Sequence, residues 1–395
     1  MPKGKNTHLE HLEDSIINEG KTGGEEAIEI LKYLGSFLSG SPAPGLLVTT
    51  KWDGAPAIVC GIDPSDNQFF VGTKSVFAQD AKICKTEQDI RKWYSGALAE
   101  KLSAALTYLP QCGITGVLQG DLMFTNDKQR EKIDGMDYIT FRPNTITYAV
   151  VPDSPLGQKI NRASLGIVFH TKYTGPSLPE MKASFSINDR DFRSTTQVWA
   201  EKAEFKDISG VASMNPLEKD AYDKLVRKTE GSLKKTGTIL NRMQTGKKTL
   251  AIDTELKKFF NNYVKKGQNI PSVDRAYLEF ATHLGKEYSK VVEKHKTLKA
   301  QADKAGKFIE AINFISDNER EFKMMIATYM NLISAKQMLV DKMKRVGSLR
   351  LFVSIGGDYQ ATSPEGFVAI KGSTATKIID RLEFSRLNFT VDKIW

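Results

Sequence analysis

The hydrophobic pattern of this chain changes its period twice, and this limits the folds that it can adopt. From Leu46 to about Phe205, short apolar or alternating runs are separated by turn residues, which is typical of β-strands. From about Asn215 to Val346 the pattern is helical, and after Gly347 strand-like runs return. We therefore expect one strand-rich domain into which the helical block is inserted.

The expected elements divide the chain into three parts. An N-terminal helical segment covers residues 1–45, and its first helix ends at Gly20. Residues 46–210 and 347–395 form an α+β domain of antiparallel sheets, interrupted by one helix from about Glu87 to Leu106. Residues 211–346 form the basic helical insertion, in which 277–315 and 319–346 are two long helices. The predicted fold class is α+β with a long helical insertion.

Charge is distributed unevenly between these parts. The net charge is +9, yet Ala221 to Arg350 holds 27 Lys and Arg against 14 Asp and Glu, a net charge of +13, so the remainder carries −4. A basic helical block beside a slightly acidic domain suggests a polyanionic partner such as RNA or DNA. The alternative is a solvated helical surface without a partner.

Composition argues against several classes of protein. No apolar run reaches the about eighteen residues that a membrane span requires, and the N-terminus turns acidic too soon for a signal peptide. Cys60, Cys84 and Cys112 are an odd number of cysteines without CxxC spacing. We expect them to be buried thiols in a reducing cytoplasm, without a disulfide framework or a zinc site. The sequence leaves the oligomeric state open.

The stretch TTKWDGAP at 49–56 places Lys51 between an apolar run and Asp53-Gly54. It fits a lysine beside a hairpin turn. It also resembles the Lys-x-Asp-Gly signature of the covalent nucleotidyltransferases, the superfamily of DNA ligases, RNA ligases and mRNA capping enzymes. In that superfamily the lysine is the nucleophile, and Asp53 would point to the same strand face as Lys51. The resemblance assigns catalytic roles to Lys51 and Asp53.

Further stretches follow in the superfamily's order. Lys74 in GTKSVF matches a basic residue that approaches the sugar and phosphates of the nucleotide. Asp121 in VLQGDLMF matches an acidic residue that contacts the ribose or helps to hold a metal, and a charge among apolar neighbours is costly to bury without a partner. Glu365 in SPEGFVAIKG matches the carboxylate that binds the catalytic Mg²⁺, a cation that requires oxygen ligands. His170 in SLGIVFHTK would line the same cleft, although a lone strand histidine is more often structural.

The resemblance also indicates contacts to the triphosphate and the base. Lys371 and Lys377 match the lysines of the last motif, and Lys377 is the better fit. Phe141 and Tyr148 are aromatic residues that would stack on the base. The helical insertion has no counterpart in the superfamily. Many members have an arginine where this chain has Pro56, which leaves the sugar contact and the choice among ATP, GTP and NAD open.

Taken together, these motifs imply an antiparallel-sheet, ATP-grasp-like ligase domain that uses ATP and Mg²⁺. It would form a lysyl-AMP at Lys51 and pass the AMP to the 5′-phosphate of a polynucleotide. Neighbouring cations and partial burial would free the lone pair of the lysine. Only about ten residues follow Phe384, which favours RNA over duplex DNA as the acceptor. The whole chain also resembles uncharacterised proteins of large tailed bacteriophages, which implies the cytoplasm of a bacterial host.

Two other classes of function stay open. One is a catalytically degenerate protein that binds a nucleotide or nucleic acid. The other is a phage virion or assembly protein whose helical hairpin contacts other proteins. Nucleotide binding, and nucleic-acid binding that weakens with salt, would separate these classes.

Overall fold

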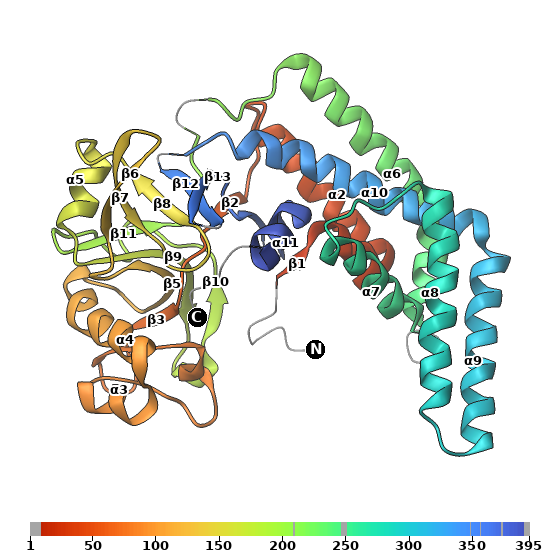
Figure 1. Ribbon diagram of the computed structural model, residues 1–395, viewed down its shortest axis with the longest axis horizontal. Helices are drawn as coiled ribbons and strands as arrows, with labels where there is room; N and C mark the ends of the chain where they lie inside the picture. Colours follow the sequence, from red (N-terminus) through yellow and green to blue (C-terminus); the bar gives the residue numbers. More distant parts are fainter. Residues whose placement is uncertain are drawn as a thin grey trace.

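The computed structural model describes residues 9–207, 210–245, 251–347, 349–355, 357–372 and 374–390. The protein is a mixed α+β structure with mainly antiparallel sheets, so the expected fold class is confirmed at this level. Figure 1 shows a strand-rich lobe on one side and a lobe of long helices on the other.

The strands belong to three sheets and are, in chain order, β1 (Glu10–His11), β2 (Leu46–Lys51), β3 (Ala57–Ile62), β4 (Phe69–Gly72), β5 (Val117–Phe124), β6 (Gln129–Ile133), β7 (Met136–Phe141), β8 (Thr147–Val150), β9 (Leu165–Thr174), β10 (Lys182–Ser184), β11 (Val198–Lys202), β12 (Arg350–Ile355), β13 (Asp358–Ala361), β14 (Gly366–Lys371) and β15 (Thr374–Ile378). The α-helices are α1 (Ser15–Asn18), α2 (Gly20–Phe37), α3 (Glu87–Trp93), α4 (Gly96–Tyr108), α5 (Pro155–Arg162), α6 (Pro216–Thr245), α7 (Ile252–Lys265), α8 (Val273–Glu293), α9 (Leu298–Asp317), α10 (Glu319–Met343) and α11 (Arg381–Thr390).

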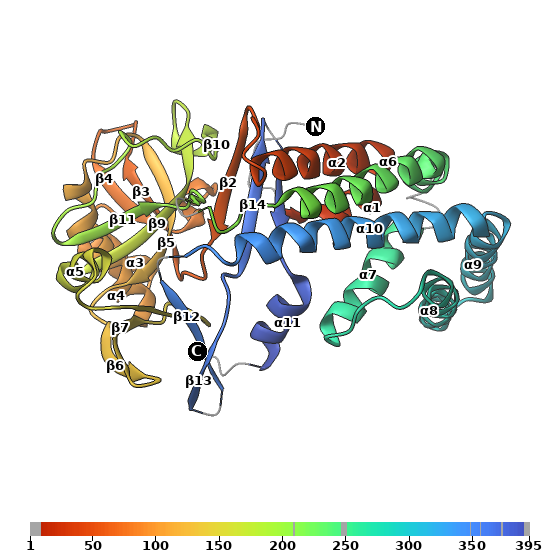
Figure 2. The same ribbon diagram turned by 90° about the horizontal axis from the view of Figure 1, so that it is seen from above.

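The central sheet brings together segments from both ends of the chain. Its order is β1-β15-β14-β2, and β14 runs antiparallel to β2 with Gly366 opposite Lys51. Figure 2 shows β2 and β14 side by side between the strand-rich lobe and the helices. Because β14 and β15 follow the helical block in the chain, this sheet can form only when the two strand-rich segments meet, as the return of the strand pattern predicts.

The strand-rich lobe contains the other two sheets. A six-stranded sheet has the order β10-β9-β5-β3-β4, with β11 beside β9, and a five-stranded sheet has the order β13-β12-β8-β7-β6. Helices α3 and α4 cover the face of the six-stranded sheet that carries Ile58 and Leu118. A second core, which includes Phe124 and Phe141, fills the space between the two sheets.

The N-terminal helices and the insertion share one hydrophobic core. It includes α2, α6, α7, α8 and α10, and it extends to Val48 and Phe367 of the central sheet. Helix α2 lies close to α6, because a Cβ at Gly24 would come 2.6 Å from Leu233 and one at Gly35 would come 2.5 Å from Tyr222. Glycine is needed at these positions for the close helix packing. Residues 9–38 and 216–343 therefore form one helical lobe rather than two separate parts.

Two of the predicted helices are each broken in two. The run 277–315 forms α8 and α9, which turn at 294–297, and the Thr297 side chain caps α9 by accepting a hydrogen bond from the Ala300 N–H at 3.3 Å. The run 87–106 forms α3 and α4, separated where Gly96 adopts a φ of +57°. Neither break contains proline, and the helical periodicity of the sequence continues through both.

The two ends of the chain also differ from expectation. Residues 10–11 form the short strand β1, which pairs in parallel with β15, in place of the predicted helix from residue 8. Gly20 has a φ of +65° and begins α2 instead of ending a longer helix. The strand-like run ATKIIDRLEF changes to helix after Ile378, because Asp380 accepts hydrogen bonds from the N–H groups of Leu382 and Glu383 and so caps α11.

Candidate active site

The central sheet has one face against the helical lobe and an opposite face that carries the candidate catalytic lysine. Phe367 and Ala369 of β14 pack into the helical core. Side chains alternate along a strand, so the pairing of Lys51 with Gly366, and of Lys377 with Val368, places both lysines on the opposite face. The structure thus brings Lys51 and Lys377 together across three adjacent strands.

Lys51 forms an ion pair with Glu365, the residue just before β14. Burial raises the pKa of Glu365 to about 6, while the Lys51 ammonium acts in the opposite direction and the Asp53 and Asp121 carboxylates add to the rise. Lys377 is half-buried, and burial together with the nearby Lys51 charge lowers its pKa. Among the described residues Lys377 has no salt-bridge partner. The two lysines, Lys51 and Lys377, therefore both lie near the Glu365 carboxyl group.

Asp121 approaches this cluster from the six-stranded sheet. It lies opposite Ala57 in β3, directly after the loop that carries Trp52 to Pro56. A Cβ at Gly54 would come 2.5 Å from the Asp121 Cβ, so the Lys-x-Asp-Gly stretch needs glycine for close approach to this carboxylate. The Nε2 of His170 lies 3.6 Å from Asp121 Oδ1. Asp121 therefore lies near the Lys51–Glu365 pair, and His170 lies beside Asp121.

Asp53 has a different role from the catalytic one predicted for it. It is 7% exposed, and its carboxylate accepts hydrogen bonds from the Asn144 side chain at 2.6 Å and from the N–H groups of Thr145 and Ile146 at 2.7 Å each. Its own N–H donates to the Tyr148 hydroxyl at 2.8 Å. These contacts occupy the carboxylate, so Asp53 is a positioning residue that fixes the loop after Lys51.

The prediction that Phe141 and Tyr148 stack on a base is wrong. Both rings are buried, at 2% and 3% exposure, in the core between the two sheets of the strand-rich lobe. Tyr148 stacks on Trp52 at 5.4 Å and on Phe141 at 5.5 Å, which leaves no ring face for a ligand. An aromatic ring that does lie beside Lys51 is Phe384 of α11, whose centroid lies 5.7 Å from Lys51 Nζ. The sequence signalled no such role, because this segment has a strand-like pattern.

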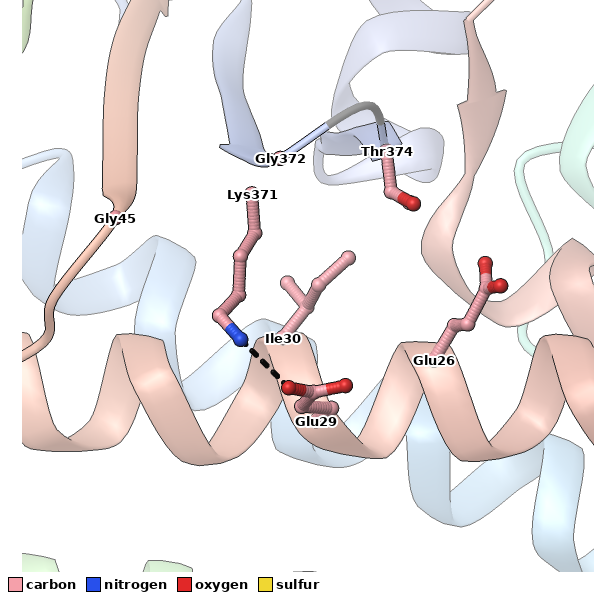
Figure 3. Close-up of a pocket in the computed structure, with 7 residues that line it drawn as sticks. All are labelled: Glu26, Glu29, Ile30, Gly45, Lys371, Gly372 and Thr374. Atoms are coloured by element: carbon pink, nitrogen blue, oxygen red, sulfur yellow. Dashed lines mark hydrogen bonds and ion pairs between the residues drawn. The ribbon is translucent and has the colours of Figure 1, made fainter.

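Lys371 does not belong to the site. It shares a strand face with Phe367 and Ala369 and therefore points to the helical lobe, at the end of β14 that pairs with Leu46. Figure 3 shows its ammonium directed at Glu29 of α2, at 2.6 Å, in an open pocket that Gly45 and Thr374 also line. It also lies 3.7 Å from the Tyr33 ring centroid. The spacing after Glu365 suggested a phosphate contact, but strand alternation turns this lysine away.

Lys74 lies at the margin of the site. It begins a short 3₁₀ turn, Lys74–Phe77, just after β4, and its side chain is exposed. Because Gly72 pairs with Val59 in β3, Lys74 stands at the sheet end where Ala57 and Asp121 lie. Within the described ranges it has no salt-bridge partner. Its position is compatible with the predicted contact to a nucleotide, although no contact joins it to Lys51.

A buried ionic network supports the strand that carries Lys377. The Lys336 ammonium of α10 lies 2.7 Å from both Glu13 oxygens, and these residues are 1% and 0% exposed. Arg381 lies 3.3 Å from Glu13 and 3.0 Å from Asp14, and Tyr329 donates to Asp14 at 2.8 Å. The network joins the segment after β1 to α10 and to the segment after β15. Sequence patterns did not reveal it, because its members are far apart in the chain.

The carboxylates of the site suit a cation that takes its remaining ligands from a substrate. No group of three His, Cys, Asp or Glu side chains arranged to hold a metal occurs in the described part of the chain. Mg²⁺ usually keeps several waters and binds one or two carboxylates together with substrate phosphates. Glu365 and Asp121, with their mutually unfavourable charges, fit that pattern. Asp53 does not, because its oxygens are already occupied.

Several other predictions fall outside the site. The three cysteines are buried and free. No helix in the described ranges is long and apolar enough to cross a membrane.

Comparison with known proteins gives a family but no function. A family model described as "Family of unknown function (DUF6267)" matches residues 6–393. No curated protein and no solved structure matches the chain.

Proposed function

The chain belongs to the family of unknown function DUF6267, and from the geometry of its site we propose that it is an ATP-dependent nucleotidyltransferase of the polynucleotide ligase type. The proposal includes the finer fold assignment, an antiparallel-sheet ligase-like domain with a helical insertion. Nucleotide, Mg²⁺ and nucleic acid are its proposed ligands, and RNA is the favoured acceptor.

One observation carries the proposal. Lys51 lies far in sequence from Glu365 and Lys377; the register of the central sheet places Lys51 and Lys377 on one face, and Glu365 joins them through its ion pair with Lys51. Asp121 from a second sheet completes the cluster. A surface lysine beside a hairpin turn would not require a buried carboxylate and a second, half-buried lysine next to it.

The first step would form a covalent intermediate. Lys51 first loses its ammonium proton to solvent; the lone pair of the resulting amine attacks the α-phosphorus of ATP, a P–N bond forms, and the bond from the α-phosphorus to the bridging oxygen breaks. Pyrophosphate leaves with that electron pair, and the nitrogen gives up a second proton to solvent. Lys377 would offset the charge of the departing phosphates. Mg²⁺, held by Glu365 and Asp121, would neutralise phosphate charge.

The second step would transfer the nucleotide. An oxygen of the acceptor's 5′-phosphate attacks the phosphorus of the lysyl-AMP, the P–N bond breaks, and the Lys51 nitrogen takes up a proton as it leaves. The product is a polynucleotide with AMP joined through a 5′–5′ pyrophosphate. The Phe384 ring centroid lies 5.7 Å from Lys51 Nζ, so an acceptor or base bound at Lys51 would contact α11.

The test is incubation of the protein with ATP, GTP or NAD in the presence of Mg²⁺, followed by intact-mass measurement. We expect an acid-labile nucleotide adduct with ATP that is absent in Lys51→Ala. The matched control is Lys371→Ala, which removes a lysine from the other face of the same sheet. It should form the adduct as the unmodified protein does. An adduct that persists in Lys51→Ala, or no adduct with any of the three nucleotides, would refute the covalent mechanism.

A further inference from the structure

The lysines of the helical lobe fall into two groups. On α6, α7 and α10 most of them are neutralised by Asp or Glu. They are Lys219, Lys224, Lys234, Lys257, Lys258, Lys323, Lys336 and Lys342. The positive charge of these helices is therefore largely compensated within the lobe.

The end of the α8–α9 hairpin is different. Residues 286–307, which we call the hairpin tip, hold seven lysines and three acidic residues, and of these only Glu287 and Lys290 form a salt bridge with each other. The other six lysines have no salt-bridge partner among the residues that the structure describes. They are Lys286, Lys294, Lys296, Lys299, Lys304 and Lys307.

The hairpin tip presents these charges in an ordered way. Lys286, Lys290 and Lys294 are four residues apart and lie on one side of α8, over a length of about 12 Å. Helices α8 and α9 pack against each other through Tyr288 and Phe308, whose ring centroids are 5.4 Å apart. Figure 1 shows the hairpin at the end of the molecule opposite the strand-rich lobe.

We propose that the hairpin tip binds the phosphate backbone of a polynucleotide whose end reaches Lys51. This rests on the proposed function for the identity of the ligand. Exposed, unpaired lysines can contact phosphates without breaking an existing ion pair, and their contacts release counterions from the nucleic acid. Lysine-rich surfaces read backbone charge and not base sequence, so the contact would be independent of sequence.

The position of the hairpin tip sets a minimum length for such a ligand. Helix α10 runs from the base of the hairpin to the strand-rich lobe, and its 25 residues span about 37 Å, while the 20 residues of α9 carry the tip about 30 Å away from that base. At about 3.4 Å per base pair along a duplex, a duplex must have more than about ten base pairs to touch both the tip and Lys51. Shorter acceptors would use the active site alone.

The test compares two triple variants of the full-length protein. The first is Lys294→Gln with Lys296→Gln and Lys299→Gln, at the tip. The matched control is Lys224→Gln with Lys234→Gln and Lys258→Gln, which removes the same charge from lysines that form salt bridges on α6 and α7. Binding of labelled single-stranded RNA and duplex DNA, long and short, is measured between about 50 and 200 mM salt.

We expect the tip variant to bind long RNA at least about tenfold more weakly, and its salt slope to fall by about 2 for RNA and about 3 for duplex DNA. The affinity of the control variant, and the affinity of either variant for short strands, should change little.

Equal losses of affinity in both variants would overturn the proposal, as would an unmodified protein that binds neither nucleic acid. Adduct formation at Lys51, measured on the same preparations, should be unchanged in the tip variant. If the unmodified protein forms no adduct but the tip variant still binds nucleic acid more weakly than it does, the result would refute the proposed chemistry and support nucleic-acid binding by the hairpin tip.

Discussion

Replacing Lys336 by methionine should lower the free energy of unfolding by about 3 kcal/mol. Methionine keeps the apolar stem of the lysine in the core but removes the ammonium that lies 2.7 Å from both oxygens of the buried Glu13. Leaving one member of a buried ion pair alone typically costs about 3–5 kcal/mol. We expect the low end of that range, because Arg381 still lies 3.3 Å from Glu13.

The assay is urea unfolding at pH 7, followed by circular dichroism and analysed by linear extrapolation. The single variant Glu13→Gln and the double variant Glu13→Gln with Lys336→Met complete the cycle. The double variant removes both charges and should recover most of the loss, and the difference between its loss and the sum of the two single losses should give a coupling energy of about 2 kcal/mol. Lys323→Met is the control on the same helix, since its partners Asp274 and Glu319 are exposed, and its effect should be much smaller. A loss in Lys336→Met no larger than in Lys323→Met, or a coupling energy near zero, would show that the buried pair does not stabilise the lobe as argued.

Three further predictions follow from the site. Asp53→Ala should lower the free energy of unfolding by about 3 kcal/mol, because the Thr145 and Ile146 N–H groups lose their buried acceptor. It should also abolish adduct formation. A variant with wild-type stability in urea would contradict the stabilising role of Asp53. Phe384→Ala should speed adduct formation in a stopped time course if the ring limits access to Lys51, whereas an unchanged rate would show that α11 does not obstruct the site. Burial, helped by the Arg381 charge, lowers the pKa of His11 from 6.5 to about 3, so the unfolded chain takes up a proton below pH 6.5 that the folded one refuses. The free energy of unfolding should therefore decrease as the pH is lowered, by about 2 kcal/mol between pH 6.5 and about pH 5. In urea titrations, His11→Gln should remove that part of the pH dependence.

The resemblance to the nucleotidyltransferases assigned Lys51 and Glu365 to one site. In the structure Gly366, the residue after Glu365, pairs with Lys51 across β2 and β14, and the Lys51 and Glu365 side chains form an ion pair. The return of strand periodicity after the helical block was sufficient to predict that distant segments share a domain. Local pattern and pairing agree here, which is why the prediction succeeded.

The predictions failed where the outcome depends on which face or core a residue joins. Lys371 was assigned by its charge and its distance from Glu365, yet the alternation of Phe367 and Ala369 with it already placed it on the helical face. Phe141 and Tyr148 were assigned as aromatic residues near the motifs, but aromatic identity does not distinguish a ligand platform from a packed core. The turn between α8 and α9 has no glycine or proline to mark it; the Thr297 cap and a hydrogen bond from the Gln301 side chain to the His295 carbonyl, at 2.8 Å, fix it.

The composition of the central sheet has a consequence for how the protein is made. Glu365 lies 314 positions after Lys51, and β14 and β15 are added only after the whole helical block has been translated. A nascent chain thus carries its lysine for most of its synthesis without the acidic partner or the second cation. Products that terminate early, or that lose β14 and β15 to proteolysis, keep the Lys-Trp-Asp-Gly stretch but lack Glu365 or Lys377. The cluster around Lys51 can therefore form only after the last strands of the chain have been translated.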